Sequence, residues 1–225
     1  MAGILFIISA PSGSGKSTLV AEVRRLVEGL EFSISYTTRK PRGSEEPGRE
    51  YHFTDAEHFL GMVERDDFLE WAEVFGNYYG TARGGLEHAR QAGKDLLLDI
   101  DVQGALQVVH KVPEAVSIFV VPPSPEVLER RLRNRSQAEG VTDELVIKRR
   151  LAQAKQELLT LKKYKYALIN DQLEDAVTEL RDIVQFERGE GGEAAAAVAQ
   201  QLRTTVLSPR LKTVLKSFGI SDTEV

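Results

Sequence analysis

A glycine-rich stretch near the start of the chain, SAPSGSGKST at residues 9–18, has the residue types and the spacing to hold a phosphate group. An apolar run, GILFIIS, precedes it, and a helical pattern, LVAEVRRLVEGL, follows it. Between a strand and a helix, such glycines turn backbone N–H groups toward an anion at the helix N-terminus. The known phosphate-loop pattern is G-x-x-x-x-G-K-[ST], and here Ala10 replaces its first glycine. A glycine-rich turn without a ligand is the alternative, which the strand before it and the helix after it disfavour.

Two side chains of this phosphate loop (residues 10–18) add chemistry to its backbone. Lys16 can reach the β- and γ-phosphates of a nucleoside triphosphate, and the Ser17 hydroxyl can ligate the accompanying Mg²⁺. We therefore expect a triphosphate site with Mg²⁺ as its cofactor. The predicted binding residues of the loop are Ala10, Pro11, Ser12, Gly13, Ser14, Gly15, Lys16, Ser17 and Thr18.

A second set of polar residues suggests a second phosphate. Arg39 and Arg42 stand in TTRKPRGSEEPGREYHF, which is rich in turn formers and charge. The adjacent threonines, Tyr51 and the doublet Tyr78–Tyr79 favour a bidentate phosphate clamp. Taken alone, this reading is no better supported than a solvated basic turn. The phosphate loop in the same chain makes the clamp the favoured interpretation.

Several carboxylates and arginines have both a functional and a structural interpretation. Asp99 and Asp101 lie at the end of the apolar run DLLLDI, at the carboxyl edge where open α/β sheets place ligands, so we expect a functional role for both. The arginines at 130–135 either face phosphates or cover a helix surface, as long side chains often do. For Glu70 in FLEWAEVF, the residues alone indicate a carboxylate on a helix surface.

The elements that must position these residues alternate along the chain. Continuous apolar runs at 95–100, 115–121 and 166–170 resemble the first one, as expected for strands buried on both faces of a parallel sheet. Helical patterns occupy residues 17–29, 101–111, 125–133, 143–162 and 172–187. This alternation predicts an open α/β sheet with right-handed crossovers.

Three segments depart from that rhythm. Residues 36–90 form an excursion long enough for a small subdomain, and RNRSQAEGVT (133–142) is a polar gap between two helices that we interpret as a lid. The stretch ERGEGGEAAAAVAQ marks a linker near 187–193, followed by a tail of helical composition. Because this linker is rich in glycine, we expect few contacts across it, and we expect truncation after Arg188 to leave turnover intact.

Composition excludes several classes of protein. The chain has no cysteine, so disulfides, thiolate zinc sites and a cysteine nucleophile are excluded. The net charge of −5 provides no general field for nucleic acid. The first apolar run is short and lacks a preceding basic residue, which disfavours a signal peptide, and no run approaches the ~18 apolar residues of a membrane span. We expect a cytoplasmic protein with no nucleic-acid or membrane partner.

Four motifs together resemble the guanylate kinase family: SYTTRKPR (35–42), GREYHF (48–53), FLEWAEVFGNYYGT (68–81) and LLDIDVQGA (97–105). Their order and spacing match that family, and VPPSPEVLERRLRNR, IKRRLAQAKQEL and LIND extend the resemblance to about residue 187. It implies a five-stranded parallel P-loop kinase core with helices on both faces, an inserted monophosphate-binding subdomain and a short lid. The implied reaction is ATP + GMP → ADP + GDP with Mg²⁺, and dGMP is expected to be accepted as a substrate in addition to GMP.

The resemblance also implies roles for individual residues. The GMP phosphate falls on Arg39, Arg42, Tyr51 and Tyr79. Guanine falls against Ser35, Glu70, Thr81 and Asp101, with Asp99 near the nucleophilic end. The ATP phosphates face Arg131, Arg135 and Arg150, and adenine approaches Asn170. The residues expected to act in catalysis are Lys16, Arg39, Arg135 and Arg150.

The same resemblance implies a division of the chain. Residues 1–35 and 91–187 would form the core, 36–90 the GMP-binding subdomain and 133–150 the lid, leaving 188–225 as a linker and tail of unknown role. Whether the chain forms a homo-oligomer is left open.

The expected chemistry agrees with this assignment. A phosphomonoester is already a nucleophile at neutral pH, so the kinase needs no general base. The four histidines have no catalytic or metal-binding spacing. Catalysis should therefore depend on charge neutralisation and on aligning two anions.

Three alternatives remain open at this point. Related scaffold domains keep the fold but bind proteins and have a degraded phosphate loop, whereas Gly-Lys-Ser-Thr is intact here. The second alternative is another P-loop kinase, with AMP, CMP or shikimate as acceptor, and assays with a panel of acceptor substrates would distinguish it. A nucleic-acid-stimulated ATPase conflicts with the net acidity and with the absence of interleaved aromatic and basic residues.

Overall fold

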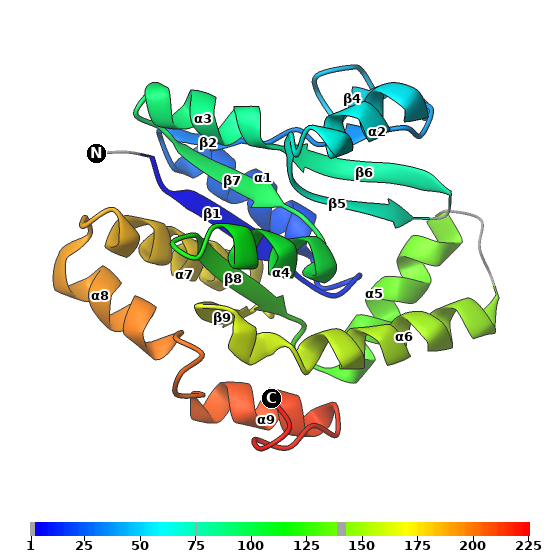
Figure 1. Ribbon diagram of the computed structural model, residues 1–225. Coiled ribbons are helices and arrows are strands. Elements are labelled where there is room, and N and C mark those ends of the chain that lie inside the picture. The colour runs from blue at the N-terminus through cyan, green and yellow to red at the C-terminus, as the bar shows by residue number, and fades with distance from the viewer. Residues whose placement is uncertain (1–2, 75, 139–142) are drawn as a thin grey trace. The chain divides into compact units, whose positions relative to one another are not determined.

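The computed structural model describes residues 3–74, 76–138 and 143–225 and has an α/β fold (Figure 1). The five strands of its larger sheet lie in the order β2-β7-β1-β8-β9. Their bounds are β1 (Leu5–Ser9), β2 (Leu30–Phe32), β7 (Asp95–Asp99), β8 (Val116–Val121) and β9 (Tyr166–Ile169). Every residue of β1, β8 and β9 is buried, as the unbroken apolar runs predict for strands covered on both faces. The predicted α/β core with a five-stranded parallel sheet is confirmed.

The helices that follow these strands begin within one residue of the predicted positions. They are α1 (Lys16–Leu26), α4 (Val102–Lys111), α5 (Pro125–Ala138), α6 (Glu144–Leu158) and α7 (Leu173–Glu187), with a short 3₁₀ helix, η1 (Leu161–Lys163). Helices α4 and α7 also end as predicted, whereas α1, α5 and α6 do not. The predictions of helices over 17–29 and 143–162 are therefore too long, because α1 ends at Leu26 and α6 ends at Leu158. The first ends early because the chain turns to form β2, which is too short to give a periodic signal.

Helix α5 corrects the expected polar gap. Ser124 caps its start, where the Val127 N–H donates to the Ser124 hydroxyl over 3.3 Å, and Pro125 is the first helical residue. The helix continues to Ala138, so Arg133 and Arg135 lie on it rather than in a loop between helices. Ion pairs from Arg133 to Glu129 and Glu144 account for the extra turn. Residues 139–142 of the expected lid lie outside the described residues.

The chain divides into two compact units, which we describe separately. One unit comprises Met1–Ile7 and Gly29–Ala115, and the other comprises Ile8–Glu28 and Val116–Val225.

The first unit contains a second sheet. Its strands lie in the order β4-β3-β6-β5, with β3 and β5 both antiparallel to β6. The bounds are β3 (Tyr36–Thr37), β4 (His52–Phe53), β5 (Phe68–Val74) and β6 (Asn77–Ala82), with helices α2 (Ala56–Glu64) and α3 (Arg83–Gln91). The helix-surface interpretation of Glu70 is wrong, because this residue lies on β5 and is buried.

An aromatic cluster packs this second sheet against α2. The Phe59 ring stacks on Phe68 with centroids 4.5 Å apart and on Tyr78 with centroids 5.4 Å apart. Phe59 is fully buried, and Met62 of the same helix joins the cluster. Packing on α2 therefore adds to the pairing of β5 with β6 in holding this sheet.

The second unit contains the tail, which is not detached. Helix α8 (Gly192–Gln201) packs along α7, and Ala195 and Ala199 are buried. The next segment pairs with β9: the Ala167 N–H donates to the Leu202 carbonyl over 2.9 Å, and Tyr166 and Arg203 form an antiparallel bridge. Helix α9 (Pro209–Ser217) follows. The expectation of few contacts across the linker is therefore wrong. The prediction that truncation after Arg188 leaves turnover intact was based on that expectation and is no longer supported by it.

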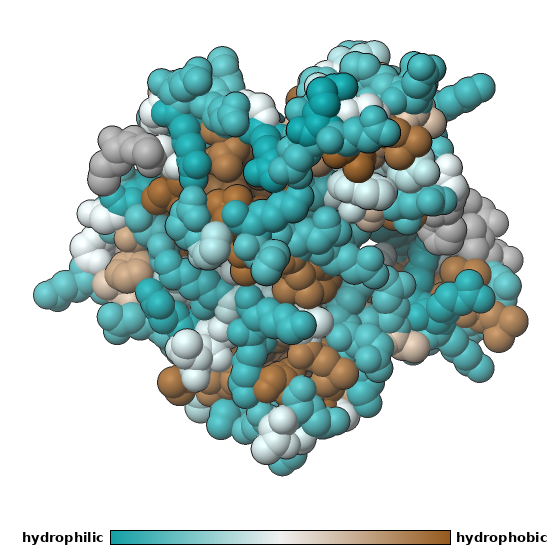
Figure 2. All heavy atoms as spheres, viewed as in Figure 1, coloured by the Kyte–Doolittle hydropathy of each residue, from teal (hydrophilic) through white to brown (hydrophobic). Residues whose placement is uncertain are grey.

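The visible face in Figure 2 is mainly hydrophilic, with apolar residues in small separate patches. The exposed large apolar side chains include Leu60 on α2, Leu145 on α6 and Val206 in the tail. Among the described residues, no helix has the length and apolar character needed to cross a membrane.

Replacing the buried Phe59 tests the aromatic cluster. We expect Phe59→Ala to lower the free energy of unfolding by about 3–5 kcal/mol, because it removes the ring that Phe68 and Tyr78 stack on and leaves a cavity. The matched control is Leu60→Ala on the same helix, where the side chain is 39% exposed and we expect a change within about 0.5 kcal/mol. Urea unfolding of both variants makes the comparison, and equal effects would contradict the packing described.

Candidate functional site

The phosphate loop joins β1 to α1 in a conformation that requires glycine. Gly13 has φ +89° and Gly15 has φ +84°, both in the left-handed region. The Ser14 N–H donates to the Pro11 carbonyl over 3.1 Å, which tightens the turn, and α1 begins at Lys16. The loop is thus an anion nest at a helix N-terminus, and the absence of a glycine at position 10 does not prevent it.

Two side chains hold the loop through the Ser14 carbonyl. Asn170 Nδ2 donates to this oxygen over 2.8 Å, and Arg131 Nη1 donates to it over 3.2 Å. Arg131 also donates to the Asn170 carbonyl from both terminal nitrogens, at 3.3 Å each. Burial lowers the pKa of Arg131, and the charge of Arg130 adds to this. The structure thus brings together the loop, Arg131 and Asn170.

The loop keeps polar groups available for a ligand. The Ser14 hydroxyl is buried and has no hydrogen-bond partner, which leaves a donor at the turn. Ser17 and Thr18 are exposed, while Lys16 is half-buried. These groups suit phosphate oxygens and a hydrated cation.

Two other predicted triphosphate residues lie on helices of the same unit. Arg135 is an exposed residue of α5, and Arg150 lies on α6. The Arg150 Nη1 atom donates to the buried Ser136 hydroxyl over 3.1 Å, so Arg150 is held against α5.

The first unit contains a pocket that gathers predicted monophosphate residues. It has a volume of about 240 Å³ and lies between the second sheet and the end of β7. Six predicted residues line it: Ser35, Tyr51, Glu70, Tyr79, Asp99 and Asp101.

Glu70 is the most unusual residue of this pocket, because its carboxylate is buried. The side chain is 6% exposed, and Thr81 donates its hydroxyl hydrogen to Glu70 Oε1 over 2.6 Å. Burial raises the pKa of Glu70 to about 7, while the hydrogen bond from Thr81 opposes this shift. Thr81 also lies 3.4 Å from the Ser35 hydroxyl, so the three side chains form one polar chain.

Room for the Glu70 carboxylate depends on Gly104, which sequence analysis did not single out. A Cβ atom added to Gly104 would lie 2.7 Å from Glu70 Oε2, closer than atoms can approach. Gly104 lies on α4 near its start, where its N–H donates to Asp101 Oδ1 over 2.8 Å. Asp101 is therefore the N-cap of α4 as well as a residue of the pocket.

Arg39 is held by an acidic partner, Glu45, which sequence analysis also missed. The Nη1 and Nη2 atoms of Arg39 donate to the two Glu45 oxygens at 2.9 and 3.0 Å, and the Arg39 side chain is 11% exposed. Hydrogen bonds to Glu45 and Tyr79 raise the pKa of Arg39, and the bond from Arg39 lowers that of Glu45. The guanidinium also lies 5.4 Å from the centre of the Tyr51 ring.

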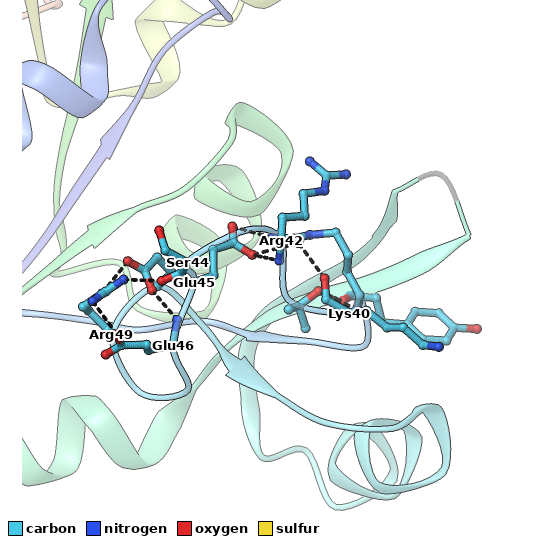
Figure 3. A network of polar contacts seen from close by, with 10 residues as sticks. Lys40, Arg42, Ser44, Glu45, Glu46 and Arg49 are labelled. Atoms are coloured by element: carbon cyan, nitrogen blue, oxygen red, sulfur yellow. Dashed lines mark hydrogen bonds and ion pairs between the residues drawn. The ribbon is translucent and has the colours of Figure 1, made fainter. Parts of the chain in front are cut away.

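Figure 3 shows the loop around Glu45. Glu45 Oε2 also accepts from the Arg42 N–H over 2.8 Å, while the Arg42 guanidinium points away from the carboxylate. Farther along, Arg49 binds Glu46, Glu50 and the Ser44 carbonyl. The only sequence sign of Glu45 was its place three residues after Arg42 in a loop dense in charge.

Across residues 3–74, 76–138 and 143–225, no cluster of histidine, aspartate and glutamate has the arrangement of a metal centre.

Comparisons with known proteins agree on one family. The family model described as guanylate kinase matches residues 3–187. The guanylate kinase of Koribacter versatilis (strain Ellin345) is 56% identical over 188 residues, which cover 84% of this chain and 80% of the relative. That of Dechloromonas aromatica (strain RCB) is 48% identical over 185 residues, covering 82% and 90%. The crystal structure of guanylate kinase from Anaplasma phagocytophilum aligns with a TM-score of 0.65 at 33% identity, over 83% of this chain and 86% of that one.

A parallel sheet whose central strand runs into a Gly-Ser-Gly-Lys-Ser-Thr loop is the architecture of a P-loop kinase, an enzyme that transfers phosphoryl groups. With the family model and the relatives in agreement, the chain belongs to the guanylate kinase family.

The raised pKa of Glu70 predicts how stability depends on pH. The folded protein holds this proton more tightly than the unfolded chain does, so the Glu70 contribution to stability falls as the pH rises from about 4.5 through about 7. Between pH 4.5 and 8.5, we expect the titration of Glu70 to lower the free energy of unfolding of the parent by up to about 3 kcal/mol. The Glu70→Gln variant should lack this decrease, because its amide does not titrate.

Urea unfolding of the parent and the Glu70→Gln variant at several pH values measures the difference. Glu73→Gln is the matched control, because Glu73 lies on the same strand and is exposed. Parallel pH profiles for the parent and Glu70→Gln would assign the titration to another group.

Proposed function

We propose that this chain transfers the γ-phosphoryl group of ATP to GMP, giving ADP and GDP. The observation that carries the proposal is the buried Glu70 carboxylate in a pocket of about 240 Å³, in a chain whose phosphate loop keeps the Gly-Lys-Ser-Thr run. Membership of the guanylate kinase family supports the same substrates.

Guanine is the base that the chemistry of this pocket fits. It presents N1–H and the N2 amino group as adjacent donors, and O6 as an acceptor. An ionised Glu70 would accept from both donors, Asp101 would take the second amino hydrogen, and the hydroxyls of Ser35 and Thr81 would reach O6. Adenine presents a bare N1 acceptor there, so it would offer no N1–H donor to the buried Glu70 carboxylate, which would keep only its hydrogen bond from Thr81.

The monophosphate would bind the two tyrosines that line the pocket, Tyr51 and Tyr79, and the guanidinium of Arg39 that lies over the Tyr51 ring. Arg39 is already oriented by Glu45 and Tyr51, and Arg42 and Tyr79 are the further ligands that we propose. Asp99, at the end of β7, would lie near the phosphate oxygen that attacks. The phosphomonoester is itself the nucleophile, so no side chain needs to remove a proton.

The triphosphate would bind the phosphate loop of the second unit. We propose that backbone N–H groups of residues 10–18 and Lys16 hold the phosphates, with Arg131, Arg135 and Arg150 neutralising their charge. Asn170 would border adenine, and the arginines at 135 and 150 would act on the transferring group together with Lys16 and Arg39. Their positions on α5 and α6 support this assignment, because α5 also carries Arg131, which contacts the loop directly.

Mg²⁺ is the cofactor that we propose, and the exposed Ser17 hydroxyl fits it. That hydroxyl follows Lys16 at the start of α1, and the partnerless hydroxyl of Ser14 leaves a donor for a phosphate oxygen in the same loop. When bound with ATP, Mg²⁺ would neutralise charge on the phosphates.

The remaining expectations stay predictions. They are the division into a core (1–35 and 91–187), a GMP-binding subdomain (36–90) and a lid (133–150), the use of dGMP, a cytoplasmic location, the absence of nucleic-acid and membrane partners, and any homo-oligomer.

Base selectivity tests the pocket. We expect GMP to be preferred over AMP by roughly 10⁴-fold in kcat/KM, because sites built around substrate hydrogen bonds reject mismatches strongly. IMP should be intermediate, since it keeps N1–H and lacks the amino group. Glu70→Gln should narrow the ratio of GMP to AMP, because an amide has one acceptor oxygen, while the control Glu73→Gln should not. Coupled assays of ADP release with each monophosphate decide this, and unchanged selectivity in Glu70→Gln would remove Glu70 from base recognition.

Lys16→Met tests the phosphate loop. We expect kcat to fall by about 10²–10³-fold or more in a folded protein, because the lost charge stabilises the transferring phosphoryl group. Lys163→Met in η1, which removes an exposed lysine outside the proposed site, is the control. Steady-state kinetics, with circular dichroism to confirm folding, compare the two. A near-normal kcat in Lys16→Met would exclude this lysine from the mechanism.

A further inference from the structure

The C-terminal tail, residues 188–225, lies outside the region that the family model matches, which ends at residue 187. It nevertheless belongs to the second unit and contributes buried side chains from both of its helices. Leu211 and Leu215 of α9 and Ile220 after it are at most 4% exposed. The tail is therefore packed on the unit that contains the phosphate loop.

The first set of tail contacts reaches the loop through Tyr164 and Lys165, the two residues that precede β9. Thr204 donates its N–H to the Lys165 carbonyl over 3.2 Å and its hydroxyl hydrogen to the Tyr164 carbonyl. The Tyr164 hydroxyl accepts from Ser9, the last residue of β1, over 2.6 Å. Since the phosphate loop begins at the next residue, the tail is two hydrogen bonds away from its start.

The tail also pairs with the start of β9 itself, at Tyr166 and Ala167. Because β9 is the last strand of the sheet order, the tail segment that pairs with it covers an otherwise open edge. The residue that follows this strand is Asn170, whose amide holds the Ser14 carbonyl. The tail thus pairs with the strand that leads to this residue, and its pairing ends at Ala167, three residues before Asn170.

The second set of contacts reaches the loop through α5. Phe218, at the end of α9, packs on a cluster formed by Leu128, Leu132, Ile147 and Ala154 of α5 and α6. A Cβ atom added to Gly13 would lie 3.0 Å from Leu128 Cδ1 and 3.1 Å from Leu132 Cδ2. The cluster that Phe218 packs against thus includes two leucines that border the turn of the phosphate loop.

We propose that the tail is a positioning element for ATP, which holds the phosphate loop in its binding conformation through β9 and α5. The proposal depends on the function proposed above, because it assumes that this loop binds ATP. Glycine residues make a loop costly to order, so its neighbours must supply the restraint. Without the tail contacts the loop would sample more conformations, and the binding-competent fraction would fall. The monophosphate pocket belongs to the other unit, so its affinity should not change.

Two tail variants test this proposal without removing the tail. Phe218→Ala removes the ring that packs on the cluster of α5 and α6. Thr204→Val removes the hydroxyl that binds the Tyr164 carbonyl, with little change in side-chain shape. We expect each to raise the KM for ATP and the Kd of a non-hydrolysable ATP analogue by about threefold to tenfold, with the KM for GMP within twofold of the parent. The control is Val206→Ala, a tail residue that is 77% exposed, which should resemble the parent.

A second measurement separates positioning from general loss of stability. Amide hydrogen exchange at residues 13–18 should be faster in Phe218→Ala than in the parent at a temperature where both are folded, while exchange in β7 should be unchanged. Phe218→Leu, which keeps an apolar side chain, should restore ATP affinity.

The possible outcomes are distinguishable. If the parent binds the ATP analogue and Lys16→Met does not, while Phe218→Ala and Thr204→Val both bind like the parent, the proposed site stands and the role of the tail is refuted. An equal rise in the KM values for ATP and GMP also refutes it. If the parent does not bind the analogue, the proposed function fails and this proposal fails with it.

Discussion

The carbonyl oxygen of Ser14 is the point on which the second unit depends. A buried carbonyl that lacks a hydrogen-bond partner costs about 1–3 kcal/mol, and in a tight glycine turn the neighbouring backbone cannot supply one. Here Asn170 and Arg131 supply the partners, from residues far along the chain. The end of β9 and the face of α5 must therefore both reach this oxygen, which fixes their register against the loop.

In the first unit, the equivalent constraint is a carboxylate with little solvent. Glu70 is tolerated on β5 because Thr81, opposite it on β6, donates to it and because Gly104 leaves space for it. Burial disfavours the ionised form of Glu70, and this raises the pKa of its carboxyl group. A site that holds a carboxyl in this way favours a ligand with paired donors, which explains why burial and selectivity arise from the same residue.

The sequence predicted the parts of the fold that have strong periodic or motif signals. The buried strands and the phosphate loop followed from apolar runs and from the spacing of Gly-Lys-Ser-Thr, and the family followed from the resemblance of four motifs between residues 35 and 105. The parts that it did not predict depend on contacts between distant residues. The three-residue strand β2 has no period to detect, and Glu70 lies on a strand because of the aromatic packing around Phe68. The role of Gly104 is set by the position of Glu70, and no pattern in the tail sequence indicates that Arg203 pairs with Tyr166 of β9.

The ion pair between Arg39 and Glu45 has a consequence for how an anion enters the pocket. Arg39 is nearly buried, and a buried cation without a counter-ion would weaken the unit, so Glu45 serves as that counter-ion. Any phosphate that takes the guanidinium must displace or share this carboxylate, which makes binding an exchange of one anion for another. When the monophosphate binds, fewer solvent anions are then released from the protein than the number of arginines in the site suggests. Affinity for the monophosphate should therefore depend only weakly on salt concentration, in contrast to an open basic patch.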